Sequence, residues 1–142
     1  MGIIIALISG ALMSIQGVFN TGVTKSTSMW VCNCFVQLTA LVAGLTIWFL
    51  TDRSSFVGII KVSPKYMLLG GIMGAAITYT VVKSMSSLGP AKSVMIIVAA
   101  QVFVAYLIEV FGLFGVTKAD FEIRKLVGVL VAVGGIILFK WK

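Results

Sequence analysis

Histidine is absent from this 142-residue chain, and Cys32 and Cys34 are its two cysteines. Two thiols without further ligands cannot complete a structural zinc site, because zinc there takes four protein ligands. The sequence also offers no nucleophile beside a general base. These absences make an enzyme the least favoured class, and we expect no catalytic residue, no metal and no cofactor.

Charged residues are scarce as well, at 11% of the chain, whereas ordinary soluble domains contain roughly a quarter. Hydrophobic residues make up 60%, which is more apolar surface than a soluble fold could cover. They occur in blocks of about twenty, the length that a helix needs to cross a bilayer. The composition therefore predicts an all-α membrane protein surrounded by the lipid bilayer.

The formal net charge of +7 would suggest a nucleic-acid partner in a soluble protein. Here the Lys and Arg residues flank the hydrophobic blocks, where cationic side chains anchor the ends of membrane spans. We therefore expect no nucleic-acid partner. The first block has no basic segment before it and no small-residue cleavage site, so it is predicted to be a retained helix and not a signal peptide.

Five transmembrane helices are predicted within one transmembrane domain, residues 1–142. Their approximate bounds are 2–23, 29–50, 64–88, 90–116 and 124–140. Small residues on these helices are expected to let neighbouring helices approach closely, and the candidates are Gly10, Ser14, Gly70, Gly74 and Gly128.

Cationic residues are nearly balanced between the two membrane sides. The side that holds the N-terminus has six: Arg53, Lys61, Lys65, Lys118, Arg124 and Lys125. The opposite side has five: Lys25, Lys83, Lys92, Lys140 and Lys142. Orientation follows the excess of Lys and Arg, so a difference of one predicts that the chain inserts both ways.

Side-chain amides inside the predicted spans are candidate substrate-binding groups, because polar residues there usually face a bundle interior or a cavity. Gln16 and Asn20 are four apart on the first helix, and Asn33 and Gln37 are four apart on the second. Each pair therefore lies on one helix face. Gln101, near the middle of the fourth helix, is the fifth candidate. The alternative is that these amides form interhelical hydrogen bonds and bind nothing.

Glu109 is the acidic residue that falls inside a predicted span, about 10 Å below the nearer surface. A buried carboxylate of this kind could couple transport to protons. Alternatively, Glu109 could form a local ion pair with Arg124 or Lys118. In an antiparallel dimer it would instead lie at the depth of the partner's Lys83.

Several residues occur in an order that is similar to one known family. They are the run 16–20 (QGVFN), the run 88–90, Gln101, Glu109, Gly112, Gly115, Arg124, Gly128 and Gly134. The chain resembles the YdcZ-like (DUF606) family of the drug/metabolite transporter superfamily. This resemblance implies a multi-pass protein of the bacterial inner (plasma) membrane, with one inverted repeat unit of a ten-helix transporter fold that assembles as an antiparallel dimer.

Two positions depart from the family pattern, since Glu109 stands where Asp is usual and Lys83 stands where an apolar residue is expected. The related small multidrug exporters also carry an essential Glu in their first helix, where this chain offers Gln16 and Asn20. The proton-coupled mechanism of those exporters therefore cannot be transferred to this chain.

The resulting hypothesis is a secondary transporter of a small organic molecule or metabolite that works by alternating access. Its partner would be a second copy of itself or a related paired subunit. A small dual-topology ion channel and a membrane accessory subunit without transport are the alternatives.

Overall fold

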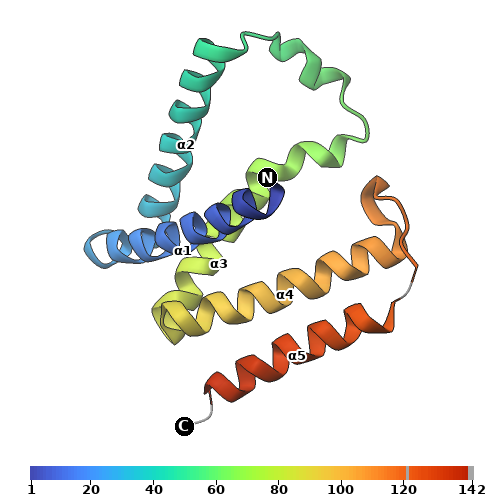
Figure 1. Ribbon diagram of the computed structural model, residues 1–142. Coiled ribbons are helices and arrows are strands. Elements are labelled where there is room, and N and C mark those ends of the chain that lie inside the picture. The colour runs from blue at the N-terminus through green and yellow to red at the C-terminus, as the bar shows by residue number, and fades with distance from the viewer. Residues whose placement is uncertain (121, 141–142) are drawn as a thin grey trace. The chain divides into compact units, whose positions relative to one another are not determined.

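The computed structural model describes residues 1–120 and 122–140, so the predicted anchor Lys142 lies outside them (Figure 1). Within that part the chain forms five α-helices: α1 (Gly2–Ser26), α2 (Met29–Thr51), α3 (Gly70–Leu88), α4 (Pro90–Phe111) and α5 (Ile123–Lys140). Three short 3-10 helices, η1 (Phe56–Lys61), η2 (Lys65–Leu69) and η3 (Leu113–Gly115), lie between them. The prediction of an all-α protein is confirmed.

Among the described residues, four helical segments are long and apolar enough to cross a membrane: Gly2–Ser26, Met29–Thr51, Lys65–Leu88 and Pro90–Phe111. The fifth helix, α5, has 18 residues and carries Arg124 and Lys125 in its first turn. That leaves residues 126–139 as its uncharged stretch. Membrane crossing by α5 therefore stays a prediction.

The third helix begins later than predicted. Pro64 is extended and stands before the 3-10 helix η2, and the α-helical conformation starts at Gly70. The two elements together still cover Lys65–Leu88, so the span is close to the expected length.

The fourth helix ends earlier than the predicted residue 116. Gly112 adopts a left-handed conformation, with φ of 63°, and its main-chain N–H reaches the carbonyls of Ile108 and Glu109. A glycine in this conformation is a common helix stop, because it carries no Cβ to clash. The error has a direct consequence for Glu109, which lies only two residues before the end of α4, or about 3 Å along the axis.

The chain divides into two units, Met1–Ser87 and Leu88–Lys142. In the first unit, α1 and α2 diverge from the turn that joins them (Figure 1). Ser28 is the N-cap residue of α2, and its hydroxyl accepts a hydrogen bond from the N–H of Val31 at 3.2 Å. The side chains of Cys32, Val82 and Met85 are buried.

In the second unit, α4 and α5 pack side by side (Figure 1). Tyr106 of α4 and Val129 of α5 are buried. The connector between the two helices is bonded to α4 through the N–H of Ala119, which donates to the Glu109 carbonyl at 2.9 Å. This bond holds the connector against the last turn of α4.

Most of the apolar surface faces outward. In each of the four span-length helices, no more than 6% of the most apolar window is buried inside the chain. A soluble protein could not expose such a surface, so lipid or another protein chain must cover it.

Candidate functional site

Three side-chain amides of the first unit lie where α1, α2 and α3 meet. We call Asn20, Asn33 and Gln37 the amide junction. Asn20 and Asn33 are buried, with 8% and 4% of their surface exposed, and Gln37 is partly buried. The sequence predicted that the amides of the first two helices share one patch that binds substrate, and this stays a prediction.

Asn33 connects α2 to α3. Its side-chain Nδ2 donates a hydrogen bond to the main-chain carbonyl of Ala75 at 2.9 Å. The other end of the amide, Oδ1, is buried and has no hydrogen-bond partner among the described residues. Buried polar atoms usually have a partner, so this oxygen is an acceptor available to a ligand or a water molecule.

Neighbouring contacts hold the junction together. The Cys32 thiol donates to the main-chain carbonyl of Asn20 at 3.4 Å, which joins α1 to α2 beside Asn33. Trp30 stacks on Tyr79, with ring centroids 5.2 Å apart, one turn from the Asn33 contact. A Cβ placed on Gly74 would lie 3.9 Å from the side-chain nitrogen of Gln37, so Gln37 also lies along the seam between α2 and α3.

Two predicted amides are not part of the junction. Gln16 lies on α1, one turn before Asn20, but its side chain is exposed. Gln101 lies on α4 in the second unit and is also exposed. Their proposed role in substrate binding stays a prediction.

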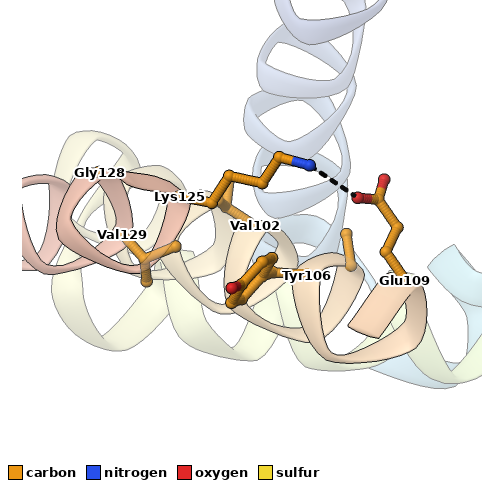
Figure 2. A pocket seen from close by; sticks show the side chains of 7 residues that line it. Val102, Tyr106, Glu109, Lys125, Gly128 and Val129 are labelled. Carbon is orange, nitrogen blue, oxygen red and sulfur yellow. Dashed lines mark ion pairs between the residues drawn. The ribbon is translucent and has the colours of Figure 1, made fainter. Parts of the chain in front are cut away.

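A separate pocket of about 360 Å³ lies between α4 and α5 in the second unit (Figure 2). We call it the α4/α5 pocket. One face of α4 and the facing turn of α5 line it: Val102, Ala105, Tyr106, Glu109, Lys125, Gly128 and Val129.

The carboxylate of Glu109 and the ammonium of Lys125 lie at the rim of this pocket, 3.9 Å apart (Figure 2). Lys125 also pairs with Glu122 at 3.2 Å. The cation beside Glu109 is thus neither Arg124 nor Lys118, which the sequence suggested for a local pair. Arg124 precedes Lys125 by one residue on α5, which rotates it by about 100° around the helix axis.

Residues 1–138 match the family DMT_YdcZ, which is described as "Putative inner membrane exporter, YdcZ". The chain belongs to this family. No curated protein and no solved structure matches it.

Membership of the YdcZ family confirms the resemblance found in the sequence. It makes the chain a multi-pass inner-membrane protein of a transporter family, in contact with the bilayer. The match runs through both units and therefore includes the amide junction and the α4/α5 pocket.

The predicted packing glycines make few contacts within this YdcZ chain. A Cβ placed on Gly10, Gly70 or Gly128 would meet nothing within 4 Å. Ser14 donates to the Gly10 carbonyl of its own helix at 3.0 Å. Their role in contacts with a second copy stays a prediction.

Sequence reasoning missed the glycine that does make a close contact. A Cβ on Gly17 would lie 2.7 Å from the Met85 sulfur and 3.4 Å from a methyl group of Val81, so α1 and α3 approach closely there. Gly17 stands within the family-like run 16–20, which was the available signal. Lys125 was also missed as a partner of Glu109, although it lies within the predicted fifth helix, three residues after Glu122.

Proposed function

We propose that this protein exports a small organic molecule as a secondary transporter, by alternating access in an antiparallel dimer, and that the amide junction binds the substrate. The observation that carries this proposal is the free Oδ1 of Asn33, buried on a helix that is long and apolar enough to cross the membrane. A substrate with an N–H or O–H group would satisfy this acceptor.

A dimer is supported by how little of each span is buried. Because at most 6% of each apolar window lies inside the chain, one copy has little interior in which to enclose a pathway. The six-to-five balance of Lys and Arg supports insertion in both orientations, which an antiparallel pair requires.

A thermal-shift screen of the purified protein tests whether the junction binds substrate. The probes are tetraphenylphosphonium as an organic cation, benzoate as an anion, and glucose and urea as neutral hydrogen-bond donors. A probe that binds the folded state raises the apparent melting temperature by mass action. We expect a neutral donor to stabilise the parent protein and to lose this effect in Asn33→Leu.

The matched control is Thr46→Leu, which replaces another polar side chain of α2. Its hydroxyl donates to the Val42 carbonyl of its own helix at 2.8 Å and lies outside the junction. Transport of the radiolabelled hit into proteoliposomes then tests the function itself. Unitary current steps in a planar bilayer would indicate a channel, and an equal loss of binding in both variants would refute the junction as the site.

A further inference from the structure

The α4/α5 pocket has its charged groups at the membrane end of the helices. Glu109 lies two residues before the end of α4 at Phe111, and Lys125 lies two residues after the start of α5 at Ile123. Since Lys125 lies 3.9 Å from Glu109, both charges share one depth. That depth is about 3 Å from the end of α4, so on a membrane span that covers Pro90–Phe111 both charges lie next to the headgroup region.

The remainder of the pocket is apolar and reaches toward the hydrocarbon. Val102 lies seven residues before Glu109, or about 10 Å deeper along α4. Val129 lies four residues after Lys125, or about 6 Å deeper along α5. Between these depths the pocket is lined by Ala105 and Gly128, whose small size leaves space between the two helices. The pocket is therefore amphiphilic, with its polarity aligned along the membrane normal.

The two rim charges attract each other without a hydrogen bond. Their separation of 3.9 Å exceeds the usual donor-to-acceptor distance, whereas Lys125 lies at 3.2 Å from Glu122. Both side chains at the rim are partly exposed, at 49% for Glu109 and 42% for Lys125. The rim thus presents an anion and a cation side by side, each with capacity for another partner.

We infer that the α4/α5 pocket binds a phospholipid with a primary-ammonium headgroup, phosphatidylethanolamine. The lipid ammonium donates to the Glu109 carboxylate, the lipid phosphate accepts from Lys125, and an acyl chain lies against Val102, Ala105 and Val129. Charge complementarity selects this occupant. A quaternary choline carries the same charge but has no N–H to donate, and a glycerol headgroup has no cation for Glu109. The lipid site requires only that α4 and α5 lie in a bilayer, and it stands whether or not the protein exports a metabolite.

A graded series of lipids tests the inference. Native mass spectrometry of the purified protein measures the dissociation constants of phosphatidylethanolamine, its N,N-dimethyl derivative and phosphatidylcholine, all with the same acyl chains. The headgroup charge is constant along the series, and the number of N–H donors falls from three to one to none. We expect binding to weaken stepwise, with phosphatidylethanolamine at least about fivefold tighter than phosphatidylcholine. Equal affinities for the three lipids would overturn the inference.

Paired variants locate the site. Glu109→Gln should reduce the preference for ethanolamine over choline to less than about twofold, because the charge-assisted bond is lost. Its matched control is Glu122→Gln, which removes the same charge from a residue that does not line the pocket. Gly128→Leu should fill the pocket without a backbone clash and weaken all three lipids, while Gly134→Leu on another face of α5 should not. If Glu109→Gln and Gly128→Leu both kept the parent's preference for phosphatidylethanolamine over phosphatidylcholine, the lipid would have to bind elsewhere.

A second copy of the chain is the competing occupant of this pocket. Ala105→Cys, introduced in a variant that lacks Cys32 and Cys34, reports on it in proteoliposomes of phosphatidylethanolamine. We expect no disulfide between copies at this position. Efficient cross-linking would show that a protein partner covers the pocket and would overturn the lipid site.

Discussion

The side-chain nitrogen of Asn33 donates to the main-chain carbonyl of Ala75 at 2.9 Å and so joins α2 to α3. A carbonyl oxygen can only accept, so this bond determines which way the Asn33 amide points. The opposite atom, Oδ1, is therefore held in the buried junction without a partner among the described residues. An unsatisfied buried acceptor costs about 1–3 kcal/mol, which a fold without need of this group would avoid.

Asn33→Leu separates a binding role of this amide from a structural one. The variant loses the hydrogen bond to Ala75 but also removes the unsatisfied Oδ1, and because these two effects oppose each other we expect the free energy of unfolding to change by less than about 1 kcal/mol. Ligand-induced stabilisation should disappear. Chemical denaturation in detergent micelles measures the free energy of unfolding. A decrease of more than about 3 kcal/mol in that free energy would show that the amide is needed for folding.

Gly17→Leu should destabilise the first unit by about 1–3 kcal/mol, because the added side chain would overlap Met85 and Val81. Gly10→Leu is the matched control on the same helix, where nothing lies within 4 Å of the new Cβ. Adding Met85→Ala to Gly17→Leu should recover part of the stability, since the shorter alanine side chain leaves room for the new leucine. A double-mutant cycle measures this coupling, and strictly additive effects would contradict the contact.

Glu109 and Lys125 should show weak but measurable coupling, because their side chains are half-exposed and 3.9 Å apart. The cycle combines Glu109→Gln with Lys125→Met and follows thermal unfolding. A second cycle with Lys83→Met serves as the control, and we expect it to be additive. Coupling between Glu109 and Lys83 that exceeds the Lys125 value would favour a pair across an antiparallel dimer.

Tyr106→Phe should loosen the connector that precedes α5. The Tyr106 hydroxyl donates to the Glu122 carbonyl at 3.2 Å, and its loss should cost about 0.5–1.5 kcal/mol. Hydrogen exchange of residues 116–120 should become faster. Tyr79→Phe is the control, because it preserves the aromatic ring that stacks on Trp30. Equal exchange rates in the parent and Tyr106→Phe would show that other contacts hold the connector.

Dual insertion can be read from a single labelled site. Gly58→Cys, in a variant without Cys32 and Cys34, places a thiol in η1, where a new Cβ meets nothing within 4 Å. We expect an impermeant maleimide to label it from both sides of the membrane. Three added Lys residues on one side should shift the population to a single orientation, because the native difference is one. Labelling from one side in the parent would exclude an antiparallel homodimer.

The helices could be predicted from the sequence because hydrophobic blocks of span length leave little alternative to a membrane helix. The starts of α2 at Met29 and of α4 at Pro90 agree with the predicted residues 29 and 90. The end of α4 was missed because apolar residues continue past Gly112. The left-handed conformation of Gly112, and not a change in hydrophobicity, ends the helix.

The candidate site was only partly predictable for a similar reason. A spacing of four residues places Gln16 and Asn20 on one face, but it does not say which of them meets another helix. Asn20 is buried and Gln16 is exposed. The contact between Gly17 and Met85 joins residues 68 apart in the chain, and no local pattern specifies such a pairing.

The uncharged stretches of α1, α4 and α5 have different lengths. On α1 it runs over residues 2–24, or about 34 Å at 1.5 Å per residue. On α4 it lies between Lys92 and Glu109, and on α5 between Lys125 and Lys140, which corresponds to about 24 Å and about 21 Å. A hydrocarbon core of about 30 Å fits neither length.

This hydrophobic mismatch has opposite signs on α1 and on the pair formed by α4 and α5. A long span adapts by tilting, whereas a short one thins the bilayer around it or extends Lys side chains toward the surface. The Lys125 ammonium at the start of α5 is suited to the second response. Lipids with shorter acyl chains therefore relieve strain around α4 and α5 while they increase the tilt of α1, so bilayer thickness acts on α1 and on the α4–α5 pair in opposite directions.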